Sequence, residues 1–409
     1  MPITSRVGKT KKFELNREHL LVGAARLFNE HGVKGATLAD VADSAGLSLK
    51  SIRYYFQRKE DLIAESFQRA IAVYSQLADT AAKAPDPRER VRVLLEEFML
   101  LSMRIRRGEH PPFLHFGDIR AVEGIETSPL GASYNMMFRR FRDLLGPTPN
   151  THEGRERLNA RTHLLFSELL WAVVWIWRYE DDQFPRVAAH MHRIFCGGLL
   201  GSPQAWQPAA LPGETRAEPI DTSSEAFLRA ATTLINEQGY RGASVDRIAA
   251  RLSVTKGAFY HYHEAKDDLV VACFQRTFDV MRAAQLNALV EPLANRQLSS
   301  VAAHLAHYQL GPQGPLLRTS ALTAVPPSIR MQMTRNMDGI SSRFNDMLTD
   351  GVVQGSVAPL DTWIGAQMLT GMLNSIAELP LWVPLADGAL AVDAYARPLF
   401  TGLFDDLNT

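Results

Sequence analysis

The stretch LSVTKGAFYHYHEAKDDLV, residues 252–270, has a counterpart far upstream in GLSLKSIRYYFQRKEDLI, residues 46–63. When Gly239 is aligned with Gly32, an offset of 207 residues, identities follow in register without a gap, and the triplet Phe-Gln-Arg recurs at 67–69 and 274–276. The ends of the two halves also match, as IFCGG from residue 194 and LFTGL from residue 399. A period of about 200 residues is too long for a solenoid. It indicates one domain duplicated end to end.

Composition places the chain among ordinary globular proteins. Its 409 residues are enough for two or three domains, and 46% apolar with 22% charged residues is a typical balance. Two cysteines without a CxxC pair exclude a disulfide framework and a cysteine-rich zinc site. The N-terminus lacks an apolar signal segment, and the most apolar run, residues 164–177, is too short for a membrane span and contains Glu168. These features predict a cytoplasmic chain with no membrane partner.

Helical periodicity dominates both copies, and no segment shows sustained strand alternation. Gly32 and Gly239 are placed to end the first helix of each copy in a left-handed cap. We expect Asn16 to cap the first of these helices, and Thr222 with Glu225 to form a capping box on its counterpart. The fold class predicted is all-α. Apolar residues spaced for one helix face are Leu20, Ala24, Leu27 and Phe28, repeated as Phe227, Ala231, Leu234 and Ile235.

A second and a third short helix follow in each copy. Thr37 and Ser244 are expected to begin the second helix, and Ser48 and Thr255 to cap the third after a tight turn. Two short helices joined by such a turn form the helix-turn-helix pattern, whose second helix enters the DNA major groove. Candidate DNA-binding residues are Thr37, Ser48, Lys50, Ser51, Arg53, Tyr54 and Lys59 in the first copy, and Ser244, Thr255, Lys256, Gly257, Tyr260, His261 and Lys266 in the second.

The two copies differ in charge around this pattern. Residues 1–60 hold 11 Lys and Arg against 6 Asp and Glu, a net charge of +5, and include the basic arm at 9–12. Residues 214–268 hold 7 against 9, a net charge of −2. Since phosphate contacts depend on positive charge, the first copy is the stronger candidate for binding the DNA backbone.

The stretch from Ser244 to Val270 resembles the DNA-binding motif of the TetR family of bacterial transcriptional regulators. The second copy carries Ile-Ala at 248–249, Gly257 and Tyr260, then Lys-x-x-Leu at 266–269. The copies depart from the family pattern at different positions. Lys50 and Arg53 replace the Gly and the first Tyr in the first copy, and Ser253 and His263 replace the turn Gly and a Phe in the second. Each half has the length of a whole family member.

The resemblance implies two fused regulators. Helix-turn-helix domains are expected at 1–62 and 223–269, helical regulatory domains at 63–203 and 270–409, and a Pro-rich linker at 204–222. Family members pair through their last two long helices, which here would be 161–179 with 186–199, and 363–379 with 392–403. The resemblance implies a DNA-binding repressor that acts as a pseudo-dimer with two heads, binds a double-stranded operator, and is released by a small hydrophobic or aromatic effector. Further homo-oligomerisation stays open.

Aromatic and Met-rich segments are candidates for the effector site. Core packing is the alternative for all of them, and for the tryptophans it is the favoured one. The candidates are Met103, His110, Phe113, Phe116, Trp171 and Trp175 in the first copy, and His304, His307, Tyr308, Met333, Met337 and Met368 in the second.

Other function classes find little support. The chain has no GxSxG, GxGxxG or HExxH motif, so we expect neither an enzyme nor a cofactor. His261 and His263 are two residues apart and would not share a helix face, which disfavours a metal site. The main alternative is a sensor or protein-interaction module in which one head has lost DNA binding.

Overall fold

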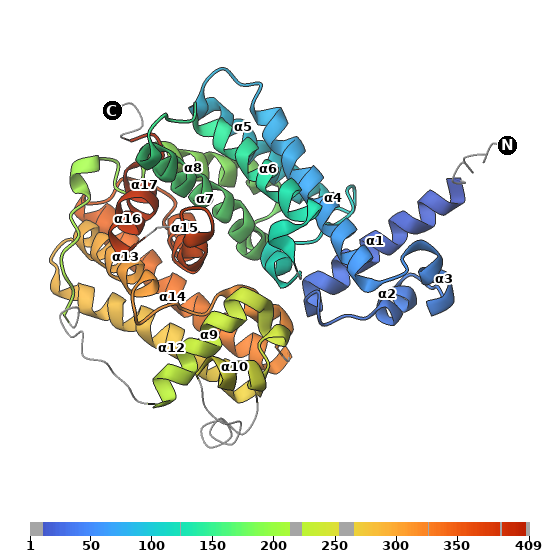
Figure 1. Cartoon of the computed structure of the whole chain (residues 1–409). Helices are drawn as coiled ribbons and strands as arrows, with labels where there is room; N and C mark the ends of the chain where they lie inside the picture. The colour runs from blue at the N-terminus through green and yellow to red at the C-terminus, as the bar shows by residue number, and fades with distance from the viewer. Residues whose placement is uncertain are drawn as a thin grey trace.

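The computed structural model describes residues 11–122, 124–212, 223–252, 266–325, 327–384 and 387–405, and all regular structure within them is helical (Figure 1). No helix in these ranges is long and apolar enough to cross a membrane. Thr255, Lys256, Gly257, Tyr260 and His261 lie outside the described residues.

Lobe 1 runs from the first helix to α8. Its head, which we call head 1, consists of α1, α2 and α3 and rests on the start of the long helix α4. The elements are α1 (Lys11–His31), α2 (Leu38–Ser44), α3 (Leu49–Tyr55), α4 (Lys59–Ala81), α5 (Pro87–Arg106), η1 (Phe116–Ala121), η2 (Ile125–Thr127), α6 (Pro129–Leu145), α7 (His152–Trp175), η3 (Ile176–Arg178), η4 (Asp181–Gln183) and α8 (Phe184–Gly197).

Lobe 2 repeats this order after a short 3₁₀ turn. Its head, head 2, contains α9 and α10 and precedes the long helix α12. The elements are η5 (Pro203–Ala205) in the connection, then α9 (Ser223–Gly242), α10 (Val245–Arg251), α12 (Lys266–Asn287), η6 (Ala288–Val290), α13 (Ala294–Leu310), η7 (Thr319–Ala324), α14 (Pro327–Gln354), α15 (Thr362–Ser375), η8 (Ile376–Leu381), α16 (Gly388–Leu390), the π-helical η9 (Ala391–Ala396) and α17 (Arg397–Thr401).

A duplicated ion pair joins each head to the long helix behind it. In lobe 1, Arg69 of α4 pairs with Glu18 of α1. In lobe 2, Arg276 of α12 pairs with Glu225 of α9 at 2.6 Å, and both partners lie 207 residues after their counterparts. The side chain of Glu225 therefore reaches α12, while its expected capping partner Thr222 lies outside the described residues.

The expected cap at Asn16 is wrong. The first helix begins five residues earlier, at Lys11, so Asn16 lies inside it. There its amide donates a hydrogen bond to the hydroxyl of Tyr55, at 3.0 Å, and so holds α3 against α1. The periodic pattern from Leu20 onward marks the buried face of the helix but not its exposed first turns.

The two lobes pack against each other through their C-terminal helices (Figure 1), with α7 and α8 facing α15, η9 and α17. The backbone amide of Leu199 donates to the carbonyl of Leu399 at 3.1 Å, and that of Leu403 donates to Phe195 at 2.7 Å. His163 Nε2 lies 2.9 Å from the carbonyl oxygen of Ser375. These helices include most of the residues in the four segments that the sequence suggests for pairing.

Candidate nucleic-acid interface and regulatory interior

Local capping builds the turn of head 1. Thr37 caps α2 reciprocally with Asp40, whose amide donates to the Thr37 hydroxyl at 3.2 Å while its carboxylate accepts from the Thr37 amide at 2.7 Å. The bonds that the amide and the hydroxyl of Thr37 donate to the carboxylate lower the pKa of Asp40. Gly46 then takes a left-handed conformation, with φ of 64°, that side chains disfavour. Ser48 accepts from the amide of Ser51 at 3.1 Å and starts α3.

The helix α3 has one buried and one exposed side. Ile52 is buried, and so is Phe56 just beyond its end, which anchors the helix on the head's core. Lys50 and Arg53 are exposed, and Tyr54 is 75% exposed with its ring against the edge of Phe13. Two cations and a phenol therefore face outward from one short helix, the chemistry suited to phosphates and base edges.

The remaining candidates of head 1 surround this surface. Thr37 and Ser48 are exposed, and the hydroxyls of Ser48 and Ser51 lie 2.8 Å apart. Lys59 is half-buried at the start of α4. Sequence reasoning missed Arg58, which lies beside Lys59, is largely exposed, and donates to Asp61 at 2.8 Å. That bond lowers the pKa of Asp61. The sequence signal that points to Arg58 is a basic residue directly before the first residue of α4.

Head 2 has a similar second helix, but two of its basic side chains have partners within the head. Ser244 caps α10 by accepting from the amide of Arg247 at 3.3 Å. The guanidinium of Arg247 also donates to Gln238, at 2.6 Å, and that of Arg251 pairs with Glu237 at 3.1 Å. Lys266 begins α12. Two basic side chains of this head are thus turned back toward α9.

Aromatic side chains fill the interior of lobe 1. The ring of Tyr74 is fully buried and lies 5.6 Å from that of Phe113 and 5.3 Å from that of Phe116. Trp382 of lobe 2 reaches across and stacks on Phe138, with centroids 3.6 Å apart and planes 5° from parallel. The two remaining candidates here are half-buried: Met103 in α5, and His110, whose Nδ1 lies 2.7 Å from the carbonyl of Pro111.

The candidates of lobe 2 lie on two helices. On α13, Tyr308 accepts a hydrogen bond from Arg276 at 3.0 Å, the ring of His304 lies 6.4 Å from that of Tyr308, and His307 is exposed. On α14, Met333 and Met337 are buried. A cavity with room for about one water molecule is lined by Met337 together with Thr277, Met281, Gln309, Leu316, Leu317, Thr370, Leu373 and Asn374.

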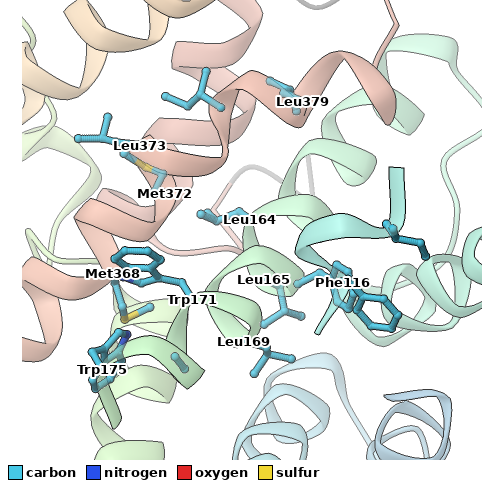
Figure 2. Packing of buried hydrophobic residues seen from close by; sticks show 14 of the residues in the cluster. Phe116, Leu164, Leu165, Leu169, Trp171, Trp175, Met368, Met372, Leu373 and Leu379 are labelled. Atoms are coloured by element: carbon cyan, nitrogen blue, oxygen red, sulfur yellow. The ribbon is translucent and has the colours of Figure 1, made fainter. Parts of the chain in front are cut away.

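The tryptophans lie at the contact between the lobes. Figure 2 shows Trp171 and Trp175 of α7 beside Met368 of α15, and all three side chains are buried. The structure therefore distributes the effector candidates over the lobe 1 core, the lobe contact and the lobe 2 interior. Among the residues described, only Met337 of this set lines the small cavity.

A buried carboxyl accompanies the tryptophans. Glu168 of α7 is fully buried, and this burial raises its pKa well above the ordinary value. Burial therefore favours the neutral form of this carboxyl. Sequence reasoning used Glu168 only as evidence against a membrane span, because periodicity alone gives no sign of what a buried glutamate faces.

Comparison with known proteins identifies the class of the two heads. The model of the bacterial regulatory proteins of the tetR family matches residues 20–65 and 227–273. Both heads therefore match the DNA-binding domain of this family, as the resemblance to TetR regulators implied. The matches also agree with the all-α fold and with the expectation that the chain is not an enzyme.

Individual relatives match over short stretches. The Transposon Tn10 TetC protein of Escherichia coli is 36% identical over 59 residues, 14% of this chain and 30% of that protein. The HTH-type transcriptional repressor KstR2 of Mycolicibacterium smegmatis is 36% identical over 69 residues, 16% of this chain and 34% of that protein. The chain thus spans about a third of these relatives. Among solved structures, apo AibR has 19% identity and a TM-score of 0.37, and the match covers 44% of this chain and 98% of AibR.

Proposed function

We propose that the chain is a sequence-specific DNA-binding transcriptional regulator, a repressor that presents two helix-turn-helix heads on one chain. The observation that carries this proposal is the exposed side of α3, where Lys50, Arg53 and Tyr54 face outward above buried Ile52. This surface belongs to a domain that the family model matches. The second family match supports a second head of the same kind.

Pairing of the two lobes supports a pseudo-dimer. A family member would pair with a second copy of itself, whereas here the equivalent helices of one chain contact each other. Two unlike heads related by a pseudo-two-fold axis read unequal half-sites. These half-sites lie about 34 Å, or a multiple of it, apart along the DNA.

Lobe 2 is the better candidate for the effector site. The core of lobe 1 is closed by its aromatic side chains and by Trp382, whereas the lobe 2 cavity lies beside a flexible methionine, Met337. A small apolar or aromatic effector would have to enlarge this cavity. It would release DNA by preferring that enlarged state, and coupling of about 1–3 kcal/mol is typical of such linkage.

A binding experiment tests the proposal. Fluorescence anisotropy would follow the full chain binding to the promoter region upstream of its own coding sequence, with and without excess unrelated DNA. Replacing Lys50 and Arg53 with Ala should weaken binding at least tenfold, and the exposed Lys83→Ala variant, just beyond the far end of α4, should leave it unchanged. Equal binding by all three proteins would reject the proposed interface.

The same experiment addresses the second candidate, a regulator in which head 2 serves as a protein-interaction module. The net charge of −2 around its motif and the turning back of Arg247 and Arg251 favour that candidate. It predicts that Lys256→Ala with Tyr260→Ala leaves operator binding intact. The two-head proposal predicts a loss of specific binding.

A further inference from the structure

One asparagine side chain ties each head to its own lobe. At the end of α1, the Asn29 amide donates to the carbonyl of Phe113 at 2.9 Å, and its oxygen accepts from the amide of His115 at 2.8 Å. Asn236 of α9, 207 residues later, repeats both bonds, to the carbonyl of Leu316 at 2.9 Å and from the amide of Arg318 at 3.1 Å. The nitrogen and the oxygen of each side-chain amide are both hydrogen-bonded. The two bonds therefore fix the orientation of the head on its lobe as well as its distance from the lobe.

In lobe 2 this connection continues into the helix that contacts lobe 1. The amide of Thr319, next to Arg318, donates to the side-chain oxygen of Asn374 in α15 at 2.9 Å. The guanidinium of Arg318 pairs with Glu378 of η8 at 2.7 Å, and both side chains are largely buried. At the 205-residue offset, the position of Asn374 corresponds in lobe 1 to Leu169, which has no polar group to offer.

The same segment forms a wall of the lobe 2 cavity. Leu316 and Asn374 both line it, and Thr277 fixes the intervening chain by accepting from the amide of Leu317 at 2.9 Å. A guest that enlarges the cavity toward this wall would displace Leu316 or Asn374. Either movement strains a hydrogen bond that leads to Asn236.

The supports of the two heads also touch. A Cβ atom built on Gly117 of η1 would lie 3.3 Å from the Cβ of Ser320 in η7. Helix α9 packs against both of these 3₁₀ segments, and α1 packs against η7. Lys34 of head 1 donates to the carbonyl of Gln238 in head 2 at 3.2 Å. A displacement at η7 therefore reaches both heads.

We propose that Asn374 and Asn236 are positioning residues that form a relay from the lobe 2 cavity to head 2, and through η7 to head 1. The regulatory role of this relay rests on the proposed function, whereas the mechanical coupling between the cavity and the heads does not. A relay of this kind shifts the equilibrium between two arrangements of the heads. Energetic coupling between the two asparagines is therefore its direct signature.

Hydrogen exchange of the full chain, measured by mass spectrometry without DNA, tests the relay. Asn236→Ala and Asn374→Ala should each raise exchange in α9 and α10 by roughly 2- to 10-fold, the effect of removing one hydrogen bond. A smaller rise is expected in α1. In the double variant the increase should be smaller than the product of the two single effects. Asn295→Ala, which removes a bond to the carbonyl of Ala205 away from the heads, is the matched control.

The conservative variant Asn374→Asp separates relay from general damage, because it retains the oxygen that accepts from Thr319. It should keep the exchange pattern of the parent protein even if Asn374→Ala unfolds. Unchanged heads in Asn374→Ala, effects that multiply in the double variant, or equal effects of Asn295→Ala would each overturn the relay. If exchange follows the expected pattern but the parent chain binds no DNA, the relay stands and the proposed function falls; if the parent binds DNA and no variant alters that binding, the relay has no regulatory role.

Discussion

Trp171 of α7 lies directly against Gly371 of α15, where the two lobes meet. A Cβ atom built on Gly371 would approach Cδ1 of the Trp171 ring to 2.5 Å and Oε2 of Glu168 to 3.0 Å. Glycine is thus the residue that leaves room for the indole. This contact favours packing between the lobes, rather than an effector pocket, as the role of Trp171.

Replacing Gly371 with Ala should weaken the contact between the lobes. Alanine favours the helix, but the crowding should dominate and destabilise the chain by about 1–3 kcal/mol. Gly339→Ala on α14 is the matched control, since nothing lies within 4 Å of the added methyl group; it should stabilise by up to about 1 kcal/mol. Urea denaturation compares the two. Similar midpoints for both variants would show that the indole moves aside freely.

Glu168 should make stability depend on pH. Because burial raises the pKa of the folded carboxyl above its unfolded value, its favourable contribution is complete below about pH 4 and is lost as the pH rises toward the folded pKa. Glu168→Gln should therefore be more stable than the parent at alkaline pH and less different from it in acid. Thermal melts from pH 4 to 9 measure this difference. The exposed Glu109→Gln variant is the control for the substitution itself. A difference in stability between Glu168→Gln and the parent that stays constant with pH would contradict the expected titration.

The duplicated tryptophans should differ in their effect on stability. Trp382→Ala removes the stacking on Phe138 across the lobes and should cost about 3 kcal/mol. Its counterpart Trp177 is 45% exposed and its indole donates to the carbonyl of Val173 in the preceding turn. Trp177→Ala should cost below about 1 kcal/mol. Denaturant melts, with size-exclusion chromatography of each variant, measure both losses of stability. Equal losses would show that Trp382 does not stabilise the chain through the lobe contact.

These tryptophans also mark what the sequence could and could not predict. Local signals are enough for the second and third helices of head 1, because Thr37, Gly46 and Ser48 act on residues within one turn of themselves, but they misplace the start of the first helix. The internal repeat also reveals the duplication. Alignment places Trp382 on Trp177, but one ring enters the opposite lobe and the other faces solvent, because packing partners some 200 residues away decide the outcome. The dispersal of the effector candidates has the same cause.

The duplicated ion pairs offer a further matched comparison. The side chain of Arg276 is 5% exposed and also donates to the hydroxyl of Tyr308, whereas Arg69 is 20% exposed and its partner Glu18 is 46% exposed. Removing a buried partner leaves the other charge uncompensated, so Arg276→Ala should cost about 3–5 kcal/mol. Arg69→Ala should cost about 1 kcal/mol. Denaturation in urea measures both costs, because uncharged urea does not screen the ion pairs as guanidinium chloride does. The reverse order of the two costs would contradict the assignment by burial.

The charge difference between the heads should divide their roles on DNA. Residues around the motif carry +5 in the first copy and −2 in the second, and Lys50 and Arg53 are exposed on α3. Replacing both with Ala should weaken binding to operator and unrelated DNA alike. It should also lower the slope of log K against log salt by about 0.9 for each phosphate that is no longer neutralised.

Head 2 should instead contribute discrimination. Lys256 and Tyr260 stand in the motif nearer the family pattern, and replacing both with Ala should weaken operator binding by about 1–3 kcal/mol for each good base contact while leaving unrelated DNA nearly unaffected. Titrations of both double variants at several salt concentrations, on operator and on scrambled DNA, measure the two effects separately. If both variants show equal decreases in specific and non-specific affinity, the charge difference does not divide the roles, and the acidic residues around head 2 are then a solvated surface without influence on which sequence is bound.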